Sequence, residues 1–154
     1  MNLGKAEIIV TDEFKRALLG YGEQQLKKCS DILYRGGLII ANQAKQNLKD
    51  NNSVITGNLH DSITVAMDSD IPAQIGSKEA GGVAVLIGTN VIYAKRVEFG
   101  FVGTDSLGRN YHQLPKPYLR PAFDEFRQTA LDYIGREMQK SFSEQGAGIG
   151  WLFE

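Results

Sequence analysis

The densest group of side chains that could do chemistry lies at residues 56–63, Thr-Gly-Asn-Leu-His-Asp-Ser-Ile. His60 and Asp61 are adjacent and Ser62 follows them, so the residue types of a hydrolytic triad are present. A triad needs these groups to converge in space, and the chain carries no Gly-x-Ser-x-Gly nucleophile elbow. We therefore favour a structural role, in which Thr56 caps a short turn ahead of a strand. A small hydrolytic enzyme that uses His60 and Asp61 stays open as an alternative.

Aromatic and cationic side chains gather between residues 93 and 111, and such groups together can stack on single-stranded nucleic acid. They are Tyr93, Phe99, Phe101, Tyr111, Lys95, Arg96 and Arg109. Residues 51–115 as a whole carry 4 basic and 6 acidic groups, which weakens attraction to phosphates. We expect core aromatics beside a solvated loop, and keep a single-strand-binding adaptor as a further alternative.

Metal and cofactor chemistry has little support in the sequence. The chain has 1 Cys and 2 His, too few for a Cys-rich or multi-His metal site. Cys29 falls on an apolar helical stripe, where a small buried side chain is the expected role. The glycine-rich segments lack the residues of a phosphate-binding loop. We therefore expect no catalytic site, no metal and no cofactor.

Length and composition fit one globular domain over residues 1–154. A chain of 154 residues can bury a hydrophobic core, and 42% hydrophobic with 23% charged residues is typical of a soluble fold. The net charge of −1 makes tight binding to nucleic acid a poor expectation, because that affinity comes mainly from neutralised phosphates. No apolar run approaches the ~18–20 residues that span a bilayer, and the first residues lack the apolar core of a signal peptide.

Two long helices are predicted, at about 23–49 and about 118–143, because apolar residues recur every three or four positions. The first stripe is Leu26, Cys29, Leu33, Gly37, Ile40, Ala44 and Leu48, and the second is Leu119, Phe123, Phe126, Ala130, Ile134, Met138 and Phe142. Gly36 and Gly37 lie inside the first helix, where each glycine costs about 1 kcal/mol relative to alanine. They indicate either a close approach of another backbone or a kink.

Strands are predicted between the helices. Residues 6–10 are β-prone, 63–67 alternate apolar and polar side chains, and 71–77 can form another strand. Residues 83–88 are almost entirely apolar, which favours a central strand. Residues 91–99 fit either a strand or a helical turn. The expected fold is α+β, with a small antiparallel sheet packed against the long N-terminal helix and the C-terminal helix.

Two glycine-rich segments complete the chain, a predicted long loop at about 100–116 and an apolar tail at about 146–154. A loop of this length inside a small domain is uncommon and usually functional. Both segments carry apolar side chains, which usually mark contact sites when exposed. They are Phe101, Val102, Leu107 and Tyr111 in the loop, and Ile149, Trp151, Leu152 and Phe153 in the tail.

Three sequence pieces, in order after a long N-terminal helix, carry a resemblance to a known family. They are Thr56-Gly57-Asn58-Leu59 with Ser62-Ile63, then Ile87-Gly88-Thr89-Asn90 running into Tyr93-Ala94 and Val97-Glu98-Phe99-Gly100, then Pro117-Tyr118-Leu119-Arg120-Pro121-Ala122-Phe123. The ordered set resembles the small neck proteins of long-tailed double-stranded DNA phages, called head–tail joining, tail-completion or minor tail-component proteins. The resemblance covers roughly residues 20–140.

The resemblance implies a structural virion protein with no enzymatic activity. Its expected assembly is a cyclic homo-oligomer, a six-fold ring at the head–tail interface, built in the host cytoplasm. Expected partners are a portal or head-completion adaptor protein, a tail terminator or tail tube protein, and DNA that passes through the lumen without sequence-specific binding. No membrane is involved. The family fold has a small antiparallel sheet, often curled toward a barrel.

Candidate interface residues follow from the motif positions and from the apolar groups of the loop and tail. The motif contributes Thr56, Gly57, Leu59, Tyr93, Glu98, Phe99, Gly100, Pro117, Leu119, Arg120 and Pro121. The loop and tail contribute Phe101, Trp151 and Phe153. We expect loop and tail to contact neighbouring subunits or adjoining neck proteins.

Overall fold

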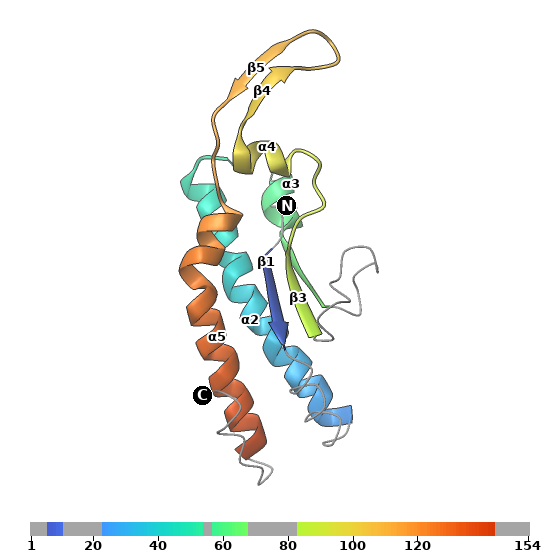
Figure 1. The fold of residues 1–154 in the computed structure, drawn as a ribbon, viewed down its shortest axis with the longest axis vertical. Helices are drawn as coiled ribbons and strands as arrows, with labels where there is room; N and C mark the ends of the chain where they lie inside the picture. Colours follow the sequence, from blue (N-terminus) through green and yellow to red (C-terminus); the bar gives the residue numbers. More distant parts are fainter. Residues whose placement is uncertain (1–5, 11–22, 54–56, 68–82, 144–154) are drawn as a thin grey trace.

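The computed structural model describes residues 6–10, 23–53, 57–67 and 83–143 (Figure 1). Two long helices, α2 (Glu23–Asp50) and α5 (Leu119–Ser143), run side by side in opposite directions over most of the length of the molecule. At 1.5 Å per residue, α2 is about 42 Å long. The two predicted helices are therefore confirmed, and their pairing sets the long axis of the protein.

The helical stripes predicted from the sequence form the buried seam. On α2 the buried apolar residues are Cys29, Leu33, Ile40, Ala44 and Leu48, and on α5 they are Leu119, Ala130, Ile134, Met138 and Phe142. Phe123 and Phe126 are only partly buried against this core. Among the described helices, none is both long and apolar enough to cross a membrane.

One small sheet packs on α2. It contains β1 (Ala6–Val10), β2 (Thr64–Met67) and β3 (Val83–Gly88), in the antiparallel order β1-β3-β2. The central position expected for residues 83–88 is confirmed, and the fold is α+β. In the described part of the chain β1 and β2 do not pair, so this sheet is open there and not a barrel. The further strand expected at 71–77 lies outside the described residues.

The chain between the sheet and α5 differs from expectation. Residues 94–99, ambiguous in sequence, form the short helix α4 (Ala94–Phe99), and α3 (Asn58–Ser62) precedes β2. The segment expected to be a long loop contains a hairpin instead, β4 (Phe101–Thr104) paired antiparallel with β5 (Asn110–Gln113). The loop prediction is wrong: Gly100 and Gly108 make turns before and between two short strands, and strands of four residues give little periodic signal in the sequence. The hairpin projects beyond the end of the helix pair (Figure 1).

Gly36 and Gly37 let the elements around α2 approach closely. A Cβ added to Gly36 would lie 2.5 Å from Cδ1 of Ile134, on α5. A Cβ added to Gly37 would lie 2.8 Å from Val65 Cγ1 and 2.9 Å from Val85 Cγ1, both in the sheet. The two glycines therefore face different neighbours. The close-approach prediction holds, although side chains rather than another backbone fill the space.

Substitution of Gly37 by Leu tests this contact. Because valine side chains are stiff at χ1, they cannot rotate out of the way, and the added side chain overpacks the sheet against the helix. We expect Gly37→Leu to lower the free energy of unfolding by about 1–3 kcal/mol, measured by chemical denaturation. Asn42→Leu, an exposed position of the same helix, is the control and should change stability little. Equal stability of the two variants would show that the Gly37 face is not packed.

Candidate functional site

A buried carboxylate joins two of the three motif pieces. Glu98, which is only 5% exposed, points at the first turn of α5. Its Oε2 accepts the backbone N–H groups of Tyr118 and Leu119 at 2.9 and 3.0 Å, and its Oε1 accepts that of Arg120 at 3.0 Å. The first N–H groups of a helix have no partner within the helix, and the dipole there favours negative charge. Glu98 therefore caps α5 from a distant part of the chain.

The peptide around Glu98 also closes the base of the hairpin. Gly100 ends α4 with a φ of +74°, and a Cβ there would lie 2.6 Å from the carbonyl oxygen of Gln113. The N–H of Lys116 donates to the carbonyl of Val97 at 2.8 Å. Both ends of the hairpin are thus fixed beside the capped helix terminus. Only glycine suits position 100, because a side chain would be strained and would collide with the returning strand.

The end of α2 completes this junction. The Asn47 amide donates to the carbonyl of Tyr118 at 3.0 Å, and the Asn51 amide donates to that of Pro117 at 2.8 Å. Lys116 Nζ donates to the carbonyl of Asn51 at 3.1 Å. Neither asparagine is among the residues predicted from the sequence. An amide one turn from a helix terminus is too common a signal to have identified them.

A hydroxyl pair connects the first motif piece to the second. Ser62 donates to the carbonyl of Leu59 at 2.9 Å, and its Oγ lies 2.6 Å from Oγ1 of Thr89. Because the Ser62 proton is already donated, the Thr89 hydroxyl is the donor in this pair. Thr89 also accepts the backbone N–H of Val91 at 3.1 Å. Ser62, which the sequence offered as part of a possible triad, therefore bonds with Thr89 and helps to fix the chain just before α4.

The hydrolytic arrangement is not assembled. His60 Nδ1 and Asp61 Oδ1 lie 2.7 Å apart, but the Asp61 side chain is 78% exposed and the hydroxyl of Ser62 bonds elsewhere. Across the residues that the structure describes, no three His, Cys, Asp or Glu side chains are grouped to hold a metal ion. Burial raises the pKa of the Cys29 thiol to about 11, so it stays protonated and unreactive. Burial, with a smaller effect of Glu98, also raises the pKa of Tyr118.

The hairpin carries a ladder of rings and guanidinium groups on one face. The Arg96 guanidinium lies 4.1 Å from the Phe101 ring centroid, and the Phe101 and Tyr111 centroids are 6.4 Å apart. Arg109 lies 5.9 Å from the Tyr111 ring centroid. The Phe101 ring also covers Gly103, where a Cβ would come within 3.0 Å of its Cζ. These contacts stabilise a two-stranded hairpin that would be marginal alone.

Asp105 orders the hairpin tip. Its Oδ1 accepts the backbone N–H groups of Leu107 and Arg109, both at 2.9 Å, and its Oδ2 lies 2.6 Å from the Arg109 guanidinium. The backbone N–H and then the side chain of Arg109 hold the pKa of Asp105 below its usual value. Gly108, with a φ of +76°, completes the turn. The hairpin is therefore ordered at both its base and its tip.

The hairpin and the segment that follows it expose three large apolar side chains among polar neighbours. Val102 is 76% exposed, Leu107 74% and Leu114 69%, although a small domain gains nothing by exposing them. In the register, Val102 pairs with His112 on the face opposite the Phe101 ring. Val102 and Leu107 are among the apolar residues predicted to mark a contact site, and Leu114 is an addition from the structure. A rigid projection with exposed apolar groups is the strongest candidate interaction surface in the described chain.

Several motif residues have structural roles within the single chain. Leu59 and Leu119 are buried in the core, and Glu98 is buried in the junction. Gly57 adopts a φ of +77° before α3, and Gly100 serves the turn described above. Their role as interface residues stays a prediction: Leu59, Leu119 and Glu98 have little exposed surface in the single chain, whereas Gly57 and Gly100 are partly exposed.

Other predicted residues keep exposed surface near the junction. Tyr93 and Phe99, at the two ends of α4, are 41% and 43% exposed. Arg120 is exposed, with its Nε 4.0 Å from Asp124, and Pro117 is exposed just before α5. Pro121 is half-buried in the first turn of α5. These residues surround the base of the hairpin and could extend its contact surface.

Three candidate residues receive no structural test. Thr56, Trp151 and Phe153 lie outside the described residues, as does the whole apolar tail at 146–154. The contact role proposed for that tail stays a prediction.

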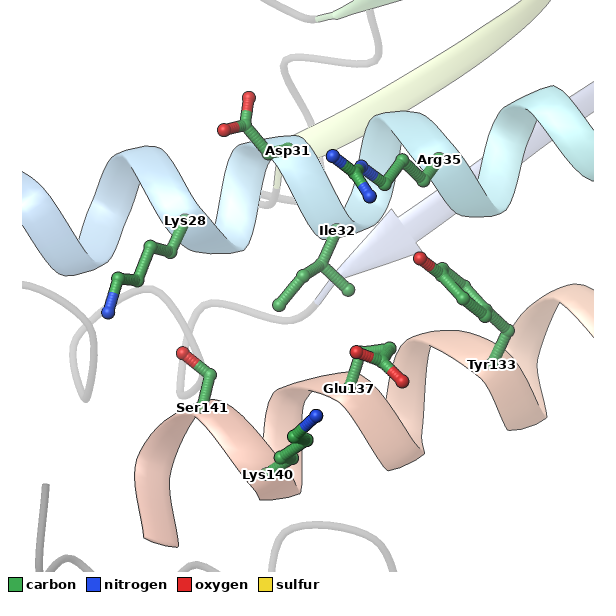
Figure 2. Close-up of a pocket in the computed structure, with 8 residues that line it drawn as sticks. All are labelled: Lys28, Asp31, Ile32, Arg35, Tyr133, Glu137, Lys140 and Ser141. Carbon is green, nitrogen blue, oxygen red and sulfur yellow. The ribbon is translucent and has the colours of Figure 1, made fainter. Parts of the chain in front are cut away.

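A groove lies between α2 and α5 at the end remote from the hairpin (Figure 2). Its volume is about 270 Å³, and it is lined by Lys28, Asp31, Ile32, Arg35, Tyr133, Glu137, Lys140 and Ser141. Cationic and anionic side chains alternate around it, as on an ordinary solvated helix surface. No arrangement of nucleophile, base and orienting group is visible among the labelled side chains.

Removal of the Glu98 carboxylate tests the junction. Glu98→Ala leaves three backbone N–H groups of the helix terminus without an acceptor. We therefore expect the free energy of unfolding to fall by about 2–4 kcal/mol in chemical denaturation. Glu98→Gln keeps one acceptor oxygen and the side-chain shape, and should lose less. Glu125→Ala removes an exposed carboxylate from the same helix and should stay within about 0.5 kcal/mol of wild type. A Glu98→Ala protein as stable as that control would contradict the capping role.

Asp105→Asn tests the order of the hairpin tip. We expect faster hydrogen exchange at the Leu107 and Arg109 amides, because a neutral acceptor binds them more weakly. The same amides should loosen in wild type as pH falls through the lowered pKa of Asp105, since a depressed folded pKa gives stability that is lost on protonation. Exchange at core amides of α2 serves as the control and should not change. Unaltered tip exchange in both experiments would show that Asp105 does not order the turn.

Comparison with known proteins gives one positive result. A family model described as "Bacteriophage HK97-gp10, putative tail-component" matches residues 12–100, more than half of the chain. Neither the comparison with curated proteins nor that with solved structures gives a match. The matched range includes α2, α3, β2, β3 and α4 but not β1 or α5, and it ends where the hairpin begins. The chain therefore belongs to the HK97-gp10-like family of bacteriophage tail components.

Proposed function

We propose that this protein is a ring-forming component of the phage neck or tail-completion layer, at the interface between head and tail. Membership of a phage tail-component family supports a structural virion protein. The observation that carries the finer proposal is how the three motif pieces are used. They build a junction that holds an ordered, projecting hairpin, and its outer apolar side chains suit contact with another protein.

A closed ring is the assembly that this shape suits. A projecting arm on one side of a subunit and a receiving surface elsewhere make a heterologous contact, which closes into a ring when the rotation allows. We propose six-fold symmetry, in keeping with the tail. The subunit would adjoin a portal or head-completion adaptor on one side and a tail terminator or tail tube protein on the other.

The electrostatics suit a conduit for DNA. With 17 basic and 18 acidic residues, the chain has a net charge of −1 and no excess of cations to hold the phosphate backbone. Each neutralised phosphate would add salt-dependent affinity and slow passage. DNA would therefore traverse the lumen without sequence-specific binding.

Measurement of assembly mass tests the ring. We expect native mass spectrometry and electron microscopy of tails or necks containing this chain to show a closed ring of about six copies. Isolated wild-type protein at high concentration should populate the same species. A strict monomer both in isolation and in the assembled particle would overturn the proposal.

The enzyme alternative has its own test. His60→Ala and Asp61→Ala should leave head–tail joining, measured as infectious particles, unchanged, because neither side chain belongs to an assembled triad. Glu98→Ala provides the positive control, since loss of the junction should reduce joining. Abolition of joining by His60→Ala in a protein of unchanged stability would favour the catalytic hypothesis.

A further inference from the structure

We propose that the apolar tail at residues 146–154 docks in the groove between α2 and α5 of its own subunit. The tail lies outside the described part of the chain, whereas the groove is lined by described residues of both helices. Docking within one subunit does not depend on the proposed ring, and it differs from the neighbour contact expected from the sequence. It gives the groove a partner that belongs to the same chain.

The groove offers apolar surface on the side of the helix pair away from the sheet. Ile32 and Tyr133 line it and are only partly buried, although both pack against the core. Ile39 and Phe126 are also partly buried, and each lies seven residues away on the same side of the same helix. Gly37 faces the sheet, and Ile39 lies about half a turn further around α2. An apolar stripe therefore runs along this side of the helix pair.

The tail has the composition to cover that stripe. Its large apolar side chains would form an exposed cluster if they had no partner, and such clusters usually mark contact sites. They are Ile149, Trp151, Leu152 and Phe153. Glycine occupies positions 146, 148 and 150. Because glycine adopts backbone conformations that other residues avoid, this spacing suits the reversal that a return along α5 requires.

Trp151 can reach the groove of its own subunit but not the hairpin. The eight residues from Ser143, the end of α5, to Trp151 span at most about 29 Å when extended. Tyr133 lies ten residues back along α5, about 15 Å from Ser143. Leu119, where the hairpin side of α5 begins, is about 36 Å from Ser143. The reach of the chain therefore favours the groove.

Two lysines make the space between the helices cationic. Lys28 and Lys140 both extend into it, whereas Asp31 points away from α5 (Figure 2). None of the ion pairs among the described residues includes either lysine. Glu137 is the acid between the helices, and its Oε1 lies 3.9 Å from Nε of Arg136. The groove therefore suits an acidic partner.

The residues that follow α5 are acidic. Residues 144–154 include Glu144 and Glu154 and neither lysine nor arginine. Opposite charge around an apolar contact favours the correct orientation of the two surfaces. A tethered segment also has an effective concentration of about 1 mM or more near its own groove, which favours it over the tail of a second copy.

Tryptophan fluorescence gives a direct test, because Trp151 is the only tryptophan in the chain. The reference is a synthetic peptide of residues 144–154, in which the ring is exposed to water. In the full chain we expect emission at a shorter wavelength than in the peptide. Acrylamide quenching should be at least about twofold weaker than in the peptide, because docking shields the ring for most of the time. Both values should stay constant on dilution below the concentration at which the protein assembles.

Charge reversal in the groove is the matched perturbation. Lys28→Glu combined with Lys140→Glu repels the acidic residues that flank the tail. Both positions are exposed, so helix content and thermal midpoint should change little. We expect the emission and the quenching of Trp151 to move toward those of the peptide. Arg136→Glu makes the same charge change at an exposed position of α5 outside the groove lining and should leave both values as in wild type.

Other outcomes separate this inference from the proposed function. Quenching in the wild-type chain as strong as in the peptide would overturn docking, as would equal values for the groove variant and the Arg136→Glu control. Protection of Trp151 that appears only on assembly would assign the tail to a neighbouring subunit and leave the ring intact. A wild-type protein that never assembles but shields Trp151 would overturn the ring and support docking within the subunit.

Discussion

The structure depends on one buried carboxylate and the helix terminus that it faces. Burying an ionised group is costly unless hydrogen bonds and favourable charge replace water. Glu98 obtains three backbone N–H donors and the positive end of a 25-residue helix. The same three hydrogen bonds hold the first turn of α5 against α4. Every feature at that end of the molecule, including the direction of the hairpin, follows from this attachment.

The rest of the fold supplies a stiff support for that attachment. The two long helices pack along an apolar seam, and the glycine pair of α2 lets α5 on one side and the sheet on another come within van der Waals contact. Asn47 and Asn51 carry the connection from α2 to the residues just before α5. The support is therefore continuous from the core to the base of the hairpin.

The family match covers part of this support, namely α2, α3, β2, β3 and α4, and leaves out β1 and α5. The match ends at residue 100, and the hairpin follows at once. Residues such as Leu59 and Glu98 build the support and present little surface. The exposed Val102 and Leu107 lie beyond the matched range. The proposed function would use both parts, because fixing an interaction surface relative to the body lowers the cost of ordering it on binding.

The sequence by itself determined the long helices, the central strand and the α+β class, because periods of 3.6 and 2 residues are local properties of the chain. It also indicated the importance of Glu98 and of the Pro-Tyr-Leu-Arg-Pro segment through the family resemblance. Only the tertiary structure decided that these two pieces touch, that residues 100–116 form a hairpin, and that Asn47 and Asn51 join them. Contacts between residues 20 to 71 positions apart depend on how packed elements approach one another, and no local pattern encodes that geometry.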